Sequence, residues 1–105
     1  MPALPKSLSV EELLLLTEAR HLAASGRARH IREAAGVSQG ELGAAVGATV
    51  AGISKWENGQ RRPTGACAIR YARLIRELAD QLSRREEVMR NHRAGNPSVG
   101  HQPAP

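Results

Sequence analysis

The sequence predicts an all-α fold, a compact bundle of helices. With 105 residues, the chain can build one modest hydrophobic core but not a second domain with an enclosed catalytic cleft. It contains no Phe, one Trp and one Tyr, so the core must consist of Leu, Ile, Val and Ala, which pack helices closely. Apolar residues also recur at helical spacing in several segments. Together these observations favour helices throughout.

The charge pattern favours a polyanionic partner. The formal net charge is +5 and the sequence pI is near 10.7, and a basic protein attracts polyanions. The excess positive charge is concentrated, because residues 27–76 contain nine Lys or Arg and only three acidic residues. The segments on either side are near neutral, so the excess positive charge lies on the central part of the chain.

The first residues and the cysteine content suggest a cytoplasmic protein. The single cysteine, Cys67, cannot form an intramolecular disulfide, which suits a reducing compartment. The start of the chain lacks a basic segment and carries Glu11 and Glu12 before a run of only four leucines. We therefore expect neither a signal peptide nor a membrane span.

No pattern in the sequence indicates a metal site or a catalytic centre. The four histidines never fall at a spacing of three or four residues from one another or from the cysteine; they are His21, His30, His92 and His101. No Ser, His and Asp arrangement, glycine-rich phosphate loop or spaced carboxylate pair is present. We expect no cofactor, no bound metal and no enzymatic activity.

The chain should begin with a disordered segment and a first helix. Residues 1–8 contain two prolines and are expected to be disordered. Ser9 and Glu12 can then form a capping box that starts a helix within residues 9–26. Residues 13–16 are all leucine, and four consecutive positions cover the whole circumference of a helix. Two interpretations stay open: the helix is clasped between helices of its own domain, or it forms a dimer interface.

Residues 27–82 are expected to form the central domain, which begins with a short helix over about 27–35. Ala28 and Ile31 lie on one stripe of this helix, and Gly36 is available to end it in the left-handed conformation. The arginines of the helix then point outward.

Two further short helices follow in the central domain. A second capping box, Ser38 and Glu41, starts a helix that Gly47 should end, where a positive φ is needed. Thr49 can cap the next helix, over 50–57. The buried positions of these two helices are expected to be Leu42, Ala45, Val46, Ile53 and Trp56. Helices this short are not stable alone, so tertiary packing must hold them.

A long last helix follows Pro63. Its apolar stripe consists of Ile69, Ala72, Ile75, Leu78, Ala79 and Leu82. Residues 83–91 should extend it beyond the domain, where Val88 and Met89 are either solvated or in contact with a second subunit. The composition of residues 92–105 supports no packing, so we expect a disordered tail.

Two short helices joined through residues 46–49 resemble the helix-turn-helix of the phage repressor and Cro-like (xenobiotic response element) family. The resemblance spans about residues 28–78. It rests on Arg32, Ser38, Gln39, Glu41, Leu42, Gly47, Ala48, Thr49, Ile53, Ser54, Trp56, Glu57, Asn58, Gly59 and Pro63. It implies a lambda repressor-like fold with an extra N-terminal helix and a long C-terminal helix, a prokaryotic or phage origin, and a DNA-binding domain over residues 27–82.

The resemblance also implies which residues bind DNA. They are Gln39, Thr49, Val50, Ala51, Gly52, Ser54, Lys55, Asn58, Arg61 and Arg62. Base contacts would come from the recognition helix, about 49–57, which fits the major groove, while Gln39, at the start of the preceding helix, would contact a phosphate or a flanking base. Similar proteins join the residues that match Arg32 and Glu57 in a structural salt bridge.

The recognition helix departs from the family pattern at three positions. Val50, Ala51 and Gly52 stand where polar side chains are often found, so these positions supply no bidentate reader of adenine or guanine. Contacts with thymine methyl groups, hydrogen bonds from Thr49 and Lys55, and readout of DNA shape remain.

The sequence thus predicts a sequence-specific transcriptional regulator, in particular a repressor, that binds a palindromic operator in double-stranded DNA as a homodimer. Such a protein would be cytoplasmic and associated with the nucleoid when bound to DNA. Two alternatives stay open. The chain could be the antitoxin of a toxin–antitoxin pair, with terminal helices that contact a protein partner, or a protein-interaction adaptor that uses the same fold without reading DNA.

Overall fold

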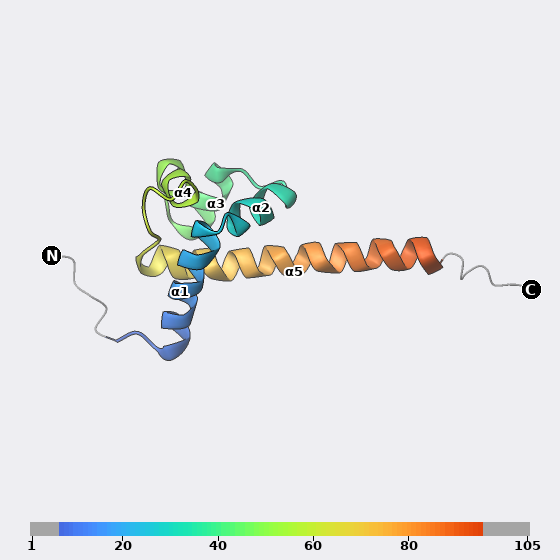
Figure 1. Ribbon diagram of the computed structural model, residues 1–105, viewed down its shortest axis with the longest axis horizontal. Helices are drawn as coiled ribbons and strands as arrows, with labels where there is room; N and C mark the ends of the chain where they lie inside the picture. Colours follow the sequence, from blue (N-terminus) through green and yellow to red (C-terminus); the bar gives the residue numbers. More distant parts are fainter. Residues whose placement is uncertain (1–6, 96–105) are drawn as a thin grey trace, which may run out of the picture.

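The computed structural model describes residues 7–95 and contains helices but no strand in that range. Residues 7–95 form five helices, which are arranged as in Figure 1. They are α1 (Val10–Ala24), α2 (Arg27–Ala34), α3 (Gln39–Val46), α4 (Val50–Glu57) and α5 (Gly65–Gly95). The predicted all-α bundle is confirmed. None of the helices in the described residues is both long enough and apolar enough to cross a membrane.

Side-chain caps set the starts of three helices where the sequence predicted them. The backbone N–H groups of Glu12 and Glu41 donate to the hydroxyl oxygens of Ser9 and Ser38, each at 2.9 Å, and both capping boxes are complete. Thr49 accepts a hydrogen bond from the backbone N–H three residues later, also at 2.9 Å. These caps satisfy backbone donors that a helix start leaves unpaired.

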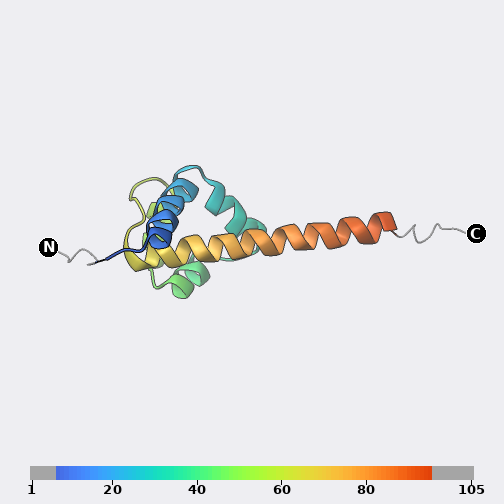
Figure 2. The same cartoon turned by 90° about the horizontal axis from the view of Figure 1, so that it is seen from below.

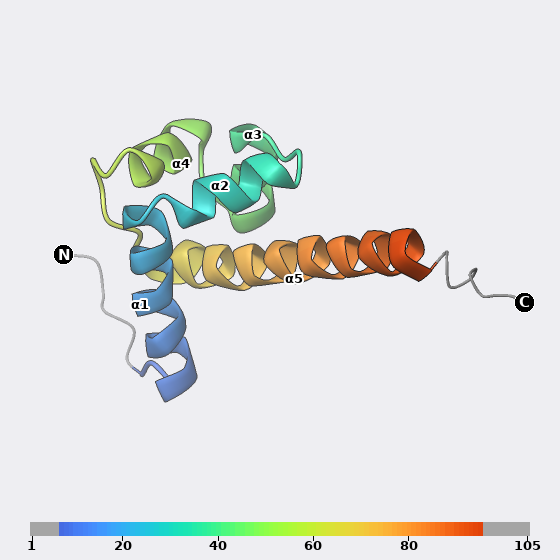
Figure 3. The same cartoon turned by 45° about the vertical axis from the view of Figure 1, so that its right-hand side comes forward.

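α1 crosses the first half of α5 and buries one side against it (Figure 1). Leu15 and Leu16 are buried, whereas Leu13 and Leu14 are 48% and 60% exposed. Only half of the four-leucine run therefore packs into the core of the domain, and the other half stays exposed. Figure 3 shows that the amino-terminal part of α1 projects past α5, away from α2, α3 and α4. An apolar face that includes Val10 is left uncovered there.

α5 supports the other helices with its first half and projects beyond them with its second (Figure 2). Ala72 and Ile75 are fully buried, while Val88 and Met89 are 65% and 62% exposed.

The helix continues to Gly95 and so includes the first residues of the tail that was expected to be disordered from residue 92. Residues 92–94 contain no helix-breaking residue, and the helix ends just before the position that precedes Pro97. The rest of that expected tail, residues 96–105, and most of the expected disordered start, residues 1–6, lie outside the described residues.

Candidate nucleic-acid interface

The turn between α3 and α4 is very short, and two glycines make it possible. Gly47 adopts φ of 86°, a left-handed conformation, and both its N–H and that of Ala48 donate to the carbonyl of Gly43 at 2.8 Å. A Cβ on Gly43 would lie 2.7 Å from the carbonyl oxygen of Ala48. The turn thus folds back onto α3 at a distance that only glycine permits.

The buried face of α3 differs from the predicted one at two positions, Ala45 and Gly43. Ala45, expected in the buried stripe of α3, is exposed, and Gly43 is buried instead. The buried face of α3 is rotated from the predicted face toward Gly43, because the backbone of the turn, and not a side chain of another helix, covers this side of α3. A glycine inside a short helix costs about 1 kcal/mol of stability relative to alanine. The presence of Gly43 within α3 was therefore the feature of the sequence that could have indicated close packing at this position.

α5 holds the turn from below. The Cys67 thiol donates to the carbonyl oxygen of Gly47 at 3.3 Å, and Nη1 of Arg70 donates to that of Val46 at 3.4 Å. The last carbonyls of a helix have no partner within it. Two side chains of α5 therefore cap the end of α3 and fix where α4 begins.

A buried ion pair joins α2 to the end of α4. Arg32 Nε lies 2.6 Å from Glu57 Oε2, and Arg32 Nη2 lies 3.0 Å from Oε1. The two side chains are only 8% and 1% exposed, so the expectation that the arginines of α2 point outward is wrong for Arg32. Arg32 Nη1 also donates to the carbonyl of Val37 at 2.8 Å, so one guanidinium holds α2, the loop before α3, and α4.

Both members of this pair stay charged at neutral pH. Hydrogen bonding to Glu57 raises the pKa of the Arg32 guanidinium. Burial alone would raise the pKa of Glu57, but hydrogen bonds from Arg32 and Gln39, together with the positive charges of Arg32 and Arg29, outweigh it and hold that pKa below its ordinary value.

Gln39 lies at the first position of α3 and is half-buried. Its side-chain Nε2 donates to Glu57 Oε1 at 2.9 Å. This contact uses one of the two N–H groups of the amide. The other N–H remains a candidate donor, and the ion pair orients it.

The expected recognition helix, α4, is anchored on one side and exposed on the other. Ile53 is fully buried and Trp56 is 6% exposed. The rings of Trp56 and Tyr71 pack edge to face, with their centroids 5.0 Å apart. Tyr71, which the predicted apolar stripe of α5 did not include, is fully buried. The remaining candidates on this helix and at its ends are exposed or half-buried; they are Thr49, Val50, Ala51, Gly52, Ser54, Lys55 and Asn58.

The candidates form three groups along the chain. Thr49, Val50 and Ala51 lie at the amino end of α4, where the helix starts. Ser54 and Asn58 lie near the other end and are joined by a hydrogen bond of 3.3 Å from Asn58 Nδ2 to Ser54 Oγ. Arg61 and Arg62 follow in the exposed loop before α5. The structure thus places apolar and hydroxyl groups at the start of the helix and cations after its end.

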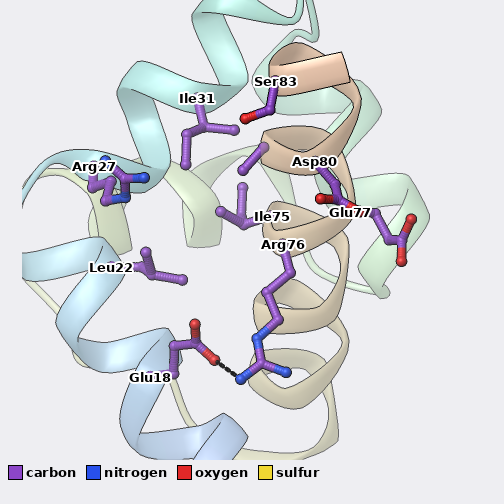
Figure 4. Close-up of a pocket in the computed structure, with 10 residues that line it drawn as sticks. Glu18, Leu22, Arg27, Ile31, Ile75, Arg76, Glu77, Asp80 and Ser83 are labelled. Carbon is purple, nitrogen blue, oxygen red and sulfur yellow. Dashed lines mark ion pairs between the residues drawn. The ribbon is translucent and has the colours of Figure 1, made fainter. Parts of the chain in front are cut away.

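A groove outside the α3 and α4 pair carries both acidic and basic side chains. The groove, of about 470 Å³, lies between α1, α2 and α5 (Figure 4). Its lining includes three acidic residues, Glu18, Glu77 and Asp80, and two arginines, Arg27 and Arg76. An ion pair of 2.7 Å joins Glu18 Oε1 to Arg76 Nη2. Carboxylates repel phosphates, so this groove is less suited to a polyanion than the surface around α4.

Comparison with known proteins agrees with this geometry. A family model described as helix-turn-helix matches residues 29–82, just over half of the chain. The matched range begins in α2, includes α3 and α4, and ends within α5. No curated protein and no solved structure matches the chain significantly.

Replacing Arg32 with alanine should lower the free energy of unfolding by about 3 kcal/mol, because it leaves the buried Glu57 carboxylate unpaired. Urea unfolding followed by circular dichroism measures the change. The matched control is Arg29→Ala, which removes an exposed pair with Glu33 and should cost less than about 0.5 kcal/mol. Equal effects of the two substitutions would contradict a structural role for the buried pair.

Replacing Gly43 with alanine should destabilise the protein by about 1–3 kcal/mol, because the new Cβ overlaps the Ala48 carbonyl. Thermal unfolding is the measurement. Gly40→Ala is the control in the same helix, since its Cβ would meet Val50 Cγ2 at an ordinary 3.5 Å. That control should leave the melting temperature unchanged or raise it, because alanine favours a helix. A Gly43→Ala protein as stable as the control would show that the close approach is not required.

Proposed function

We propose that this chain, which belongs to the helix-turn-helix family of DNA-binding regulators, is a repressor that binds a palindromic operator as a homodimer. The observation that carries the proposal is the exposed amino end of α4, held by a helix-turn-helix frame on a basic domain. Binding over a promoter would exclude the transcription machinery, and this mechanism needs only DNA binding.

The dimensions of α4 support insertion into the major groove. An α-helix with its side chains is about 10–12 Å wide, and the groove is about 12 Å wide. Ile53 and Trp56 attach the inner side of α4 to the core, so its outer side can enter the groove without rearrangement. Arg61 and Arg62 would then contact phosphates and set the register of the protein on the duplex.

The chemistry of the exposed end supports a preference for thymine. Val50 is 53% exposed, and Ala51 next to it is exposed as well. Such apolar side chains contact the thymine methyl group in the major groove. Thr49 can donate its hydroxyl hydrogen while its oxygen caps α4, and Lys55 adds a cation without an ion pair in the described residues. Shape readout would supply further discrimination.

A homodimer would place two recognition helices about 34 Å apart, one turn of DNA. Two exposed apolar surfaces favour a protein contact: Leu13 and Leu14 on α1, and Val88 and Met89 on α5. The same surfaces support a second candidate function, in which the chain is an antitoxin or an adaptor and one of them binds a different protein.

Selection from a random duplex pool by the full chain should enrich a thymine-containing motif with two-fold symmetry. Binding to the selected duplex, followed by fluorescence anisotropy, should weaken linearly on a log–log plot against salt concentration. Lys55→Ala should reduce the slope by about 0.9, the contribution of one phosphate contact. Arg90→Ala, on the far part of α5, is the control and should keep the wild-type slope. A pool that enriches no motif would favour the adaptor function.

Light scattering of two surface variants should identify the dimer interface. If α5 joins the subunits, Val88→Glu with Met89→Glu should give a monomer, whereas Leu13→Glu with Leu14→Glu should stay a dimer; the reverse result would assign α1. Both pairs are exposed, so the domain should remain folded. A wild-type protein that is monomeric at all accessible concentrations, with and without DNA, would refute the homodimer.

A further inference from the structure

A small cleft lies between the carboxyl-terminal half of α1 and the loop after α4. Its volume is about 300 Å³, and three of its lining side chains are Arg20, Arg61 and Arg62. None of the described residues that line it carries a carboxylate. Figure 3 shows this loop passing beside α1 on its way to α5. Three arginines from two distant parts of the sequence thus meet in one concave place.

Arg20 is held in position for a ligand. Its Nε donates to the carbonyl oxygen of Pro63 at 3.0 Å, and the residue is half-buried. Among the described residues, no hydrogen bond or ion pair engages its two terminal nitrogens. A side chain fixed through Nε loses little further conformational freedom when its terminal nitrogens bind an anion.

The charges in the cleft are not compensated. Burial, and after it the positive charge of Arg62, lower the pKa of the Arg20 guanidinium. Arg61 and Arg62 are exposed and form no ion pair in the part of the chain that the structure describes. Nearby like charges repel, and an anion that accepts hydrogen bonds from them would remove this repulsion.

The cleft lies at the right place for the DNA backbone. Trp56, near the carboxyl end of α4, and Gly59 line it. Eight residues at 1.5 Å each separate the two ends of α4 by about 12 Å, which is about the width of the major groove. When the amino end of α4 contacts bases, the opposite end therefore comes near the phosphates at the groove edge.

We propose that this cleft is a phosphate-binding site in which Arg20 joins Arg61 and Arg62, and that a backbone phosphate of the bound DNA occupies it. The proposal rests on the proposed function, since the occupant is DNA. Arg20 lies outside the helix-turn-helix match, residues 29–82. The extra helix α1 thus adds a DNA contact to the binding surface as well as completing the core.

The first test is the salt dependence of binding to a random-sequence duplex, because phosphate contacts do not depend on base sequence. Arg20→Gln should reduce the log–log slope by about 0.9 and weaken binding about three- to tenfold near 100 mM salt. Arg90→Gln removes the same charge far from the cleft and should keep the slope. Arg62→Gln, in an exposed loop, should act like Arg20→Gln and serves if the latter does not fold.

The second test needs no DNA. Trp56 lines the cleft and is the only tryptophan of the chain, so its fluorescence reports occupancy. Inorganic phosphate should change the emission of the full chain in a saturable way, chloride at equal ionic strength should not, and Arg20→Gln should weaken the phosphate response at least about fivefold.

The two tests separate failure of the site from failure of the function. If the wild type binds duplex and Arg20→Gln keeps both its slope and its phosphate response, the site is refuted while DNA binding stands. If the wild type binds no duplex but Arg20-dependent phosphate binding persists, the DNA phosphate as occupant is refuted, and the proposed function fails with it. If Arg20→Gln and Arg62→Gln flatten the slope and lose the phosphate response, the proposal is supported.

Discussion

The ion pair between Arg32 and Glu57 is the constraint on which the binding surface depends. It joins α2 to the end of α4 and, through the Val37 carbonyl, to the loop before α3. The same carboxylate accepts the Gln39 amide at the start of α3. Three short helices that would not be stable alone thus share one charged centre, and the outward face of α4 acquires a fixed direction because that centre is buried.

The turn between α3 and α4 depends on a second, steric constraint. Gly43 lets the backbone of the turn approach α3, and Gly47 provides the left-handed conformation that redirects the chain. Cys67 and Arg70 then occupy the last carbonyls of α3. Since α5 supplies these contacts, the angle between the two helices is set by the whole domain and not by the turn alone.

Features that depend on local sequence could be predicted, and those that depend on distant contacts could not. The capping residues Ser9, Ser38 and Thr49 act within three positions of themselves, so the pattern of side chains reveals them. The burial of Gly43 in place of Ala45 depends on how the turn packs, which spacing alone does not report. Arg20 meets Arg62 only because α1 lies beside a loop some forty residues further along the chain.

The length of α5 has a consequence for the geometry of any assembly. Its 31 residues form one uninterrupted helix of about 46 Å, and its first turns carry the side chains that hold the turn before α4. A subunit or protein bound around Val88 and Met89 would therefore lie at a set distance and rotation from the amino end of α4. Adding or removing residues near position 84 would rotate the surface around Val88 and Met89 by about 100° per residue about the helix axis. The length of α5 would therefore determine both the distance and the rotation of a bound protein relative to α4.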